Sequence, residues 1–464
     1  MQRLCGVVGI AAVALAACQH YRPMPLDAEA VRKALEPPGE PALRIAARDL
    51  KHPLLKPVVI DLSDGLSPDE AAILAVVASP TLRAERDRRK LADAQVIQAG
   101  ILPNPQVSGG VDVPSTGTTA GTSLAYGVGL NWDVTSLIGR SQRIDGAKAQ
   151  RAQVELDVAW TEWQAAMAAR TAVVRLIGLA RQEAMAADAA DRLLEIAGRV
   201  RRSAEAGQVT AVERAAAEAA GVQAGAVLLD LRHQIGQQRL TLNRLLGLPP
   251  GAKVQIEAGA DLPARVQPPP LATLLRGLED RRLDLVALRF GYKSQEAALH
   301  AAVLGQFPRI NVGITQARDT SNVGTTGFGI TIDLPIFDRN QGRIAFEKAT
   351  RQQLFDEYTA RVFEARADLA DLSEGIRALD ALAAHGEAAI TDLERLAEAY
   401  GAALARGQAD AMSAYAAWNN LVQKRIEVAA LHQQLAEAQI ALGLAAGLYR
   451  MEDAVPAPGD EEVR

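Results

Sequence analysis

Apolar and polar side chains alternate with a period of two in four stretches, at about residues 105–114, 122–134, 308–317 and 325–337. Such alternation predicts β-strands with one apolar and one polar face. It is typical both of strands that face lipid on one side and a lumen on the other and of a half-buried sheet on a soluble domain. The polar face of the predicted strands carries these charged or amide side chains: Asp112, Asn131, Asp133, Arg309, Asn311 and Asp333.

Prolines are absent from two long stretches, Thr135 to Leu248 and Ile336 to Val455. Because a proline costs ~3 kcal/mol in a helix interior, these stretches permit very long helices. The segment Ser141–Ser203 is rich in Ala, Glu, Arg, Leu and Gln. As one helix it would be about 95 Å long at ~1.5 Å per residue, which favours a coiled coil or helical array over a globular helix.

The two halves of the chain repeat at an offset of 200 residues. Three pairs of segments match in the same order: 129–134 with 329–334, 206–208 with 406–408, and 245–248 with 445–448. The repeated unit is a helix, a pair of strands, a long helix and a shorter helix. We therefore expect a mainly α fold with a small β part, made of two copies of this unit.

The N-terminus predicts export. Arg3 precedes an apolar run, Leu4 to Ala17, that is too short to span a ~30 Å hydrocarbon core but suits a signal peptide. The run ends in Leu15-Ala16-Ala17-Cys18, which resembles the bacterial lipobox and implies cleavage before Cys18 and lipid on that residue. The alternative is an ordinary secretory signal with an incidental Cys18.

The expected organisation follows from these boundaries. The ranges are a lipoprotein signal peptide at 1–17, a Pro-rich extended segment at 18–65, the first repeat at 66–248, a linker at 249–270, the second repeat at 271–448 and a tail at 449–464.

Composition excludes several classes of protein. Aromatic residues are only 4% of the chain although hydrophobic residues are 49%, which suits thin helical layers rather than a large globule. The net charge of -5 gives no basic footprint for nucleic acid. Two cysteines and six histidines offer no disulfide framework or Cys-rich metal site, and His233 and His432 lack ligand partners at an obvious spacing. No nucleotide-binding or nucleophile motif occurs, so we expect no cofactor and no enzyme.

Four strands cannot close a barrel, and a membrane tolerates no open edge that faces lipid. Identical subunits would have to pool their strands, and two copies would give the ~8 strands of the smallest familiar barrels. Three copies would give about twelve, which can enclose a channel. This argument leaves the number of subunits open. A lipid-anchored periplasmic scaffold or adaptor without a barrel is the alternative, and the four alternating strands favour the channel.

The sequence resembles the TolC family of outer-membrane efflux channels from Leu66 to about Gly447. The segments that carry the resemblance are 79–84 (SPTLRA), 99–105 (AGILPNP) and 334–338 (LPIFD), together with the duplicated Gly-Gln turns and Leu-Gly-Leu ends. The resemblance implies a homotrimer in the outer-membrane lipid, with a 12-stranded barrel continued by an α-helical periplasmic tunnel. It also implies two partners, a periplasmic adaptor (membrane fusion) protein and an inner-membrane pump.

In this family the turns between long and short helices form the periplasmic tip, here at Gly207 and Gly407. Our gate hypothesis is that nearby charges pair across subunits in the closed state and also contact the adaptor; solvated helix-end charges are the alternative. The candidates are Glu213, Arg214, Arg406 and Asp410. Acidic residues of the best-known family pattern are replaced by Ser413 and Ala416, which puts an acidic selectivity ring there in doubt.

The cargo stays open at this point. Asp133 and Asp333 are equivalent in the repeat, so a trimer would carry six such carboxylates, enough to favour cations; simple hydration of the pore wall is the alternative. The 99–105 segment resembles members that serve metal-cation pumps, and drug efflux or a type I protein secretion duct fits the same conduit.

Overall fold

The computed structural model describes residues 20–257, 259–406 and 408–449, and the chain divides into two units, 1–39 and 40–464. Helix α2 (Ala28–Ala34) belongs to the first unit, and α3 (Glu40–Arg48) begins the second. The expectation of an extended segment over 18–65 is therefore wrong at these two helices. Asp27 caps α2 by accepting a hydrogen bond from the Ala30 amide at 2.7 Å, and Glu40 pairs with Arg44 one turn later.

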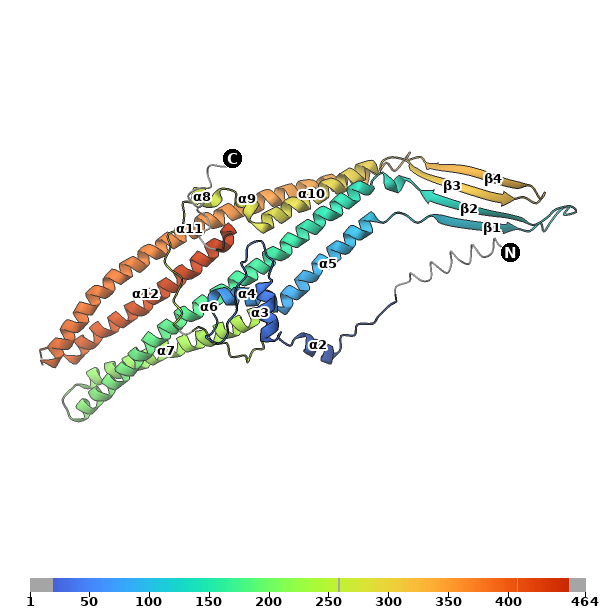
Figure 1. Ribbon diagram of the computed structural model, residues 1–464. Helices are drawn as coiled ribbons and strands as arrows, with labels where there is room; N and C mark the ends of the chain where they lie inside the picture. The colour runs from blue at the N-terminus through green and yellow to red at the C-terminus, as the bar shows by residue number, and fades with distance from the viewer. Residues whose placement is uncertain (1–19, 258, 407, 450–464) are drawn as a thin grey trace. The chain divides into compact units, whose positions relative to one another are not determined.

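Long helices form most of the second unit (Figure 1). Helix α6 (Arg140–Glu205, 66 residues) and helix α11 (Gln341–Ala405, 65 residues) fill the two proline-free stretches. Each turns back into a shorter helix, α7 (Ala211–Leu245) or α12 (Ala411–Ala446), and we call α6–α7 the first hairpin and α11–α12 the second. The remaining helices are shorter: α4 (Pro68–Ala78), α5 (Pro80–Gly100), α8 (Leu271–Leu275), α9 (Leu278–Arg281) and α10 (Leu283–Leu304).

Equivalent backbone hydrogen bonds occur in the two repeats. At the hairpin turns, Gln208 N donates to Ser203 O and Gln408 N donates to Ala403 O, each at 2.8 Å. At the ends of the returning helices, Leu248 N donates to Asn243 O at 2.8 Å and Leu448 N to Gly443 O at 2.9 Å. The bonds at 203–208, 243–248 and 443–448 belong to Schellman caps, in which a glycine takes positive φ. Gly247 and Gly447 have φ values of 67° and 68°.

The four strands form one antiparallel sheet in the order β1-β2-β3-β4. Their bounds are β1 (Gln106–Asp112), β2 (Ala125–Asp133), β3 (Arg309–Arg318) and β4 (Gly324–Asp333). The fourth strand ends before Leu334 and Ile336, although both continue the alternation, because Pro335 cannot donate to the ladder. In the described residues, β1 and β4 each have a strand partner on one side only.

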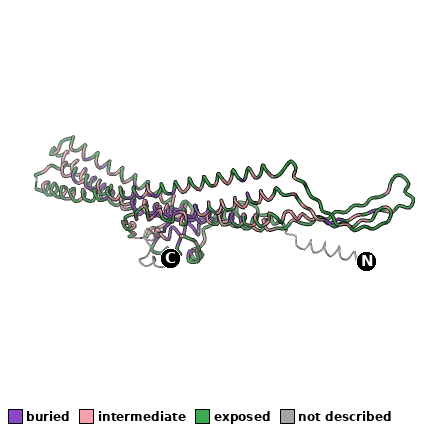
Figure 2. Tube along the Cα trace, turned by 90° about the horizontal axis from the view of Figure 1, so that it is seen from above, coloured by how far each residue is buried: buried purple, intermediate pink, exposed green. Residues whose placement is uncertain are grey.

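Two large apolar cores hold the helices together, and a third, small cluster joins α5 and α6. The larger joins α4, α6 and α7 and contains Ile73, Trp163 and Leu242, while the second joins α10, α11 and α12 through Leu285, Leu369 and Leu442. Figure 2 shows that buried residues gather along the helices, whereas the strands are mostly exposed. Among the described residues, none of the helices combines the length and the hydropathy needed to cross a bilayer.

Candidate functional site

The polar face of the sheet collects all six side chains that the alternation assigned to it. Directly opposed residues of antiparallel strands point to the same face. Asp133 lies opposite Asn311, Arg309 opposite Asp333, Asn131 opposite Gly313 and Asp112 opposite Ala125. Because successive residues alternate between faces, Asp112, Asn131, Asp133, Arg309, Asn311 and Asp333 share one face.

Glycines make room on this face for the polar side chains. The Asn131 side chain lies over Gly313, where an added Cβ would meet Asn131 Oδ1 at 2.2 Å. Thr315 similarly covers Gly327, and Ser108 covers Gly129. Polar groups are thereby held close to the sheet, a feature that alternation alone does not predict.

The two carboxylates that the repeat makes equivalent lie in different surroundings. Asp133 is partly buried, and its Oδ1 accepts a hydrogen bond from the Thr135 amide at 2.9 Å, which caps the turn after β2. Asp333 is exposed and lies opposite Arg309 across the β3–β4 pair. Asp333 is thus the more available of the two, and Asp112, also exposed, lies nearer the other end of the sheet.

The opposite face of the sheet is apolar and exposed. Leu130, Ile314 and Phe328 lie side by side on three neighbouring strands. Their exposed fractions are 46%, 55% and 71%. An apolar sheet face of this extent needs a covering, since exposed apolar patches of this kind mark membrane or partner contacts.

The candidate gate charges make local contacts at the helix ends of their own chain. Thr210 and Glu213 form a reciprocal capping box, in which Glu213 accepts a hydrogen bond from Thr210 N at 2.6 Å and its own amide donates to Thr210 Oγ1. Asp410 caps α12 by accepting bonds from Ser413 N at 2.8 Å and Ser413 Oγ at 2.7 Å. These bonds hold the pKa of Asp410 below its usual value.

The remaining candidates of the hairpin ends are also placed, except Gly407. Arg406 Nε donates to the Ala402 carbonyl at 3.2 Å, and exposed Arg214 lies in the first turn of α7. In the described part of the single chain, no ion pair joins these charges to one another. Pairing across subunits stays a prediction. Gly407 and the lipidation residue Cys18 lie outside the described residues.

A buried ionic cluster ties the N-terminal segment to α5 and α6. Glu162, with 5% of its side chain exposed, accepts hydrogen bonds from Arg86 Nε at 2.5 Å and Arg89 Nη2 at 3.1 Å. His52 lies beside it, and its Nδ1 accepts from the amides of Leu54 and Leu55 while Nε2 donates to Ala159 O. This pattern fixes the neutral tautomer, and burial lowers the pKa of His52.

We expect the stability of the protein to fall as the pH drops below about 6.5, the ordinary pKa of histidine. The pKa of His52 is lower in the folded chain, so the unfolded chain binds the proton first as the pH falls. Binding lowers the free energy of the unfolded chain relative to that of the folded chain. The contribution is complete above the unfolded pKa and is lost as the pH falls through the folded one. Thermal unfolding at several pH values between 7 and 5 measures this contribution to stability. The variant His52→Gln, which keeps a hydrogen-bond donor and an acceptor, should show a smaller change of stability with pH. Equal slopes for both proteins would contradict the prediction.

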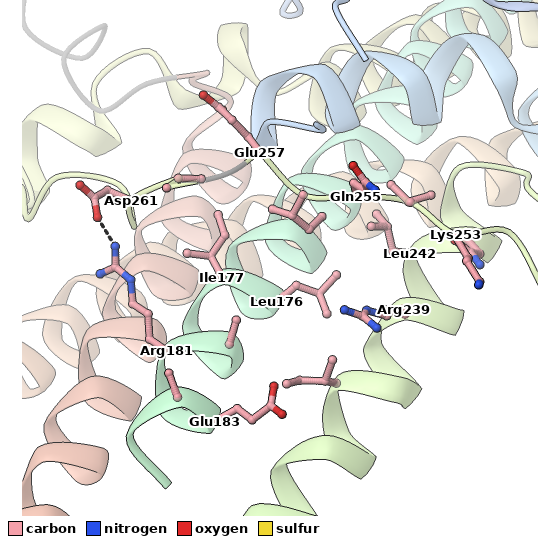
Figure 3. Close-up of a pocket in the computed structure, with 18 of the residues that line it drawn as sticks. Leu176, Ile177, Arg181, Glu183, Arg239, Leu242, Lys253, Gln255, Glu257 and Asp261 are labelled. Carbon is pink, nitrogen blue, oxygen red and sulfur yellow. Dashed lines mark hydrogen bonds and ion pairs between the residues drawn. The ribbon is translucent and has the colours of Figure 1, made fainter. Parts of the chain in front are cut away.

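An open cavity of about 980 Å³ lies between α6, α7 and linker residues 252–257 and 259–261 (Figure 3). Leu176, Ile177 and Leu242 give it apolar surface, and Arg181 reaches across to Asp261 of the linker. Among the described residues, no group of three His, Cys, Asp or Glu is placed to hold a metal ion. His233 contacts Gln237 and His432 contacts Glu387, each at 2.8 Å.

The structure is thus a duplicated helical hairpin that carries a sheet with one apolar and one polar face. The model of the outer membrane efflux protein family matches residues 74–248 and 274–448. The chain belongs to this family, whose members are passive channels of the outer membrane. This confirms the resemblance to the TolC family and favours the efflux channel over the scaffold.

Individual relatives agree with this assignment. The chain is 27% identical over 296 residues to the cobalt-zinc-cadmium resistance protein CzcC of Cupriavidus metallidurans, covering 63% of this chain and 68% of CzcC. The structure matches the outer membrane protein VceC of Vibrio cholerae (TM-score 0.68, 18% identity, 82% of this chain and 96% of VceC). It also matches the open state of the Neisseria gonorrhoeae MtrE channel (TM-score 0.62, 18% identity, 93% and 97%).

Proposed function

We propose that this protein is the non-enzymatic outer-membrane exit duct of a tripartite efflux system and acts as a homotrimer. The observation that carries the proposal is the four-stranded sheet with an exposed apolar face, a polar face and a partner on only one side of β1 and of β4. Three copies joined β1 to β4 would form a closed barrel of about twelve strands, wide enough for a lumen. The apolar face then contacts lipid and the polar face water.

The helical hairpins continue this duct toward the inner membrane. Their turns at 206–210 and 406–410 lie at the ends of α6 and α11 that are remote from the sheet (Figure 1). We assign the contact with the periplasmic adaptor to these turns, and the supply of energy to the inner-membrane pump. Lipid on Cys18 would anchor each subunit in the outer membrane.

The cargo that we assign is divalent metal cations. Two observations support it: the similarity to CzcC, a cobalt-zinc-cadmium resistance protein, and the exposed carboxylates of Asp112 and Asp333 on the polar face. The test is a strain without the gene, challenged with zinc, cobalt, cadmium and a panel of drugs. Hypersensitivity to the metals alone supports the assignment. Hypersensitivity to drugs alone, or loss of protein secretion, contradicts it.

The channel itself is tested by measuring the mass of the detergent-solubilised protein and its conductance in a planar bilayer. A trimeric mass with discrete conductance steps is the expected result. A monomeric mass without conductance would return the protein to the class of periplasmic scaffolds.

The double substitution Asp112→Asn and Asp333→Asn is expected to weaken the preference of the open channel for cations. The permeability ratio of cations to anions should fall about two- to five-fold, since a unit charge at ~4 Å is worth ~1 kcal/mol in water and salt screens part of it. The reversal potential in a salt gradient measures this ratio. Asp49→Asn, an exposed carboxylate far along the chain from the strands, is the control, and an unchanged ratio in the double variant would show that the carboxylates only hydrate the wall.

A further inference from the structure

The two repeats of one chain meet in the sheet through a single strand pair, β2 with β3 (Figure 1). This pair joins the last strand of the first repeat to the first strand of the second. The outer strands β4 and β1 are likewise a last strand and a first strand. A seam between two copies of the chain would therefore join the same two kinds of strand, and the β2–β3 pair is a template for it.

The repeat determines which residues of the two first strands are equivalent. Asn131 lies opposite Gln106. Its counterpart at the offset of 200, Thr331, lies opposite Asn311. Gln106 therefore corresponds to Asn311, and β1 corresponds to β3 at an offset of 205. The Leu-Pro pair before β1 and the Phe-Pro pair before β3 match at the same offset, which supports this equivalence independently.

We propose that β4 of one subunit pairs with β1 of the next in the register of the β2–β3 pair, with Asp333 opposite Gln106 of the partner subunit. The register follows because Asp133 lies opposite Asn311 within the chain. This inference rests on the proposed homotrimer and goes beyond it by naming the residues that meet at each seam.

The two faces of the sheet agree with this register. Thr331 lies opposite the partner subunit's Ser108, and both belong to the polar face. Phe328 lies opposite the partner subunit's Val111, and both belong to the exposed apolar face. A slip by one residue would turn the polar side chains of β1 to the apolar face, so the alternation excludes it.

The template ends in two hydrogen bonds between the strands. Val134 N donates to Ile310 O at 3.1 Å, and the Ile310 amide donates to Thr135 Oγ1. Val134 and Ile310 thus occupy a hydrogen-bonded position of the ladder. Asp133 and Asn311, one step along, form a non-hydrogen-bonded pair, in which the Cα atoms lie about 4.5 Å apart.

The counterparts in the outer strands keep the first of these bonds and lose both partners of the second together. Leu334 keeps the donor N–H, and Pro105 keeps the acceptor carbonyl. Pro105 has no N–H to donate, and Pro335, which stands in place of the threonine, has no hydroxyl to accept it. The two prolines therefore suit each other in this register, because neither leaves a polar group of the other without a partner.

The same replacement makes the Asp333 carboxylate available to the neighbouring subunit. Asp133 accepts a hydrogen bond from the Thr135 amide at 2.9 Å, whereas Pro335 has no amide to donate to Asp333. The side-chain amide of the partner subunit's Gln106 is a donor for that carboxylate. Each seam thus completes a polar pair that a single chain lacks.

Four double-cysteine variants of the full-length protein, in isolated outer membranes, test the register. Asp333→Cys with Gln106→Cys, and Thr331→Cys with Ser108→Cys, place cysteines at directly opposed positions. Their Cα atoms would be about 4.5 Å apart, within the range of a disulfide. After oxidation with diamide, both variants should run as covalent trimers on a non-reducing denaturing gel and as monomers after reduction.

The exchanged pairs are the matched controls. Asp333→Cys with Ser108→Cys, and Thr331→Cys with Gln106→Cys, use the same four positions on the same face of the sheet. Their cysteines would be diagonal neighbours about 7–8 Å apart, too far for a disulfide. Both should remain monomers on the gel. Wild type, treated in the same way, reports any cross-link through the two native cysteines.

Cross-linking of an exchanged pair in place of the direct pairs would mean a register shifted by two residues and would overturn the proposal. Four variants that form heat-modifiable trimers without any cross-link would also overturn it, because β4 and β1 would then not meet. Failure of the proposed function is a different result, namely a wild-type protein with neither a trimeric mass nor conductance.

Discussion

Arginine in place of Ile314 is expected to abolish insertion of the protein into the outer membrane. Ile314 lies in the middle of β3 with 55% of its surface exposed, between Leu130 and Phe328 on the neighbouring strands. A charge on the lipid face near the bilayer midplane costs ~2–4 kcal/mol, and a trimer would carry that cost three times. The total cost for the three subunits is comparable to the net free energy of unfolding of a typical domain, ~5–15 kcal/mol.

The adjacent residue provides the control. Thr315 points to the opposite face, so Thr315→Arg places the same charge one residue further along the same strand but in the lumen. This variant should insert and form heat-modifiable trimers, whereas Ile314→Arg should be absent from urea-washed outer membranes. Equal insertion of both would refute the assignment of faces. Failure of both would mean that β3 tolerates no arginine for reasons of packing.

Much of the fold is predictable because its signals are local and repeated. The helix expected at Ser141–Ser203 is α6, Arg140–Glu205, since good helix formers without proline leave the backbone few alternatives. The alternation placed the six polar residues on one face because the side-chain period of a strand is fixed. Helices α2 and α3 were missed because nearby prolines obscured them, although Asp27 is a recognisable N-cap.

The site is less predictable than the fold, and the hairpin ends show why. Thr210-Ala-Val-Glu213 fits the capping-box pattern, so the local contact of Glu213 could have been expected from sequence. The second repeat exchanges the two residue types, with Asp410 as the cap and Ser413 three residues on. Arg265 with Asp380 and Arg175 with Glu437 link residues more than a hundred positions apart, and no local pattern encodes such pairs.

Trp163→Ala is expected to cost about 3–5 kcal/mol of stability, the range for truncating a large buried aromatic side chain. Trp163 is fully buried in the larger core, and its ring lies 6.0 Å from that of Tyr449 beyond the end of α12. The side chain thus joins the long helix of the first repeat to the end of the second. Its removal leaves a cavity in the core that both repeats share, which also contains Ala436 and Ile440 of α12.

Trp163→Phe separates packing from hydrogen bonding. In the described part of the chain, the indole Nε1 has no hydrogen-bond partner, so phenylalanine loses packing volume but no bond. Denaturant unfolding of the detergent-solubilised protein, followed by circular dichroism, should give a much larger loss for alanine than for phenylalanine. Equal losses would point to the indole nitrogen, and a loss below about 1 kcal/mol for alanine would mean that the site collapses around the cavity.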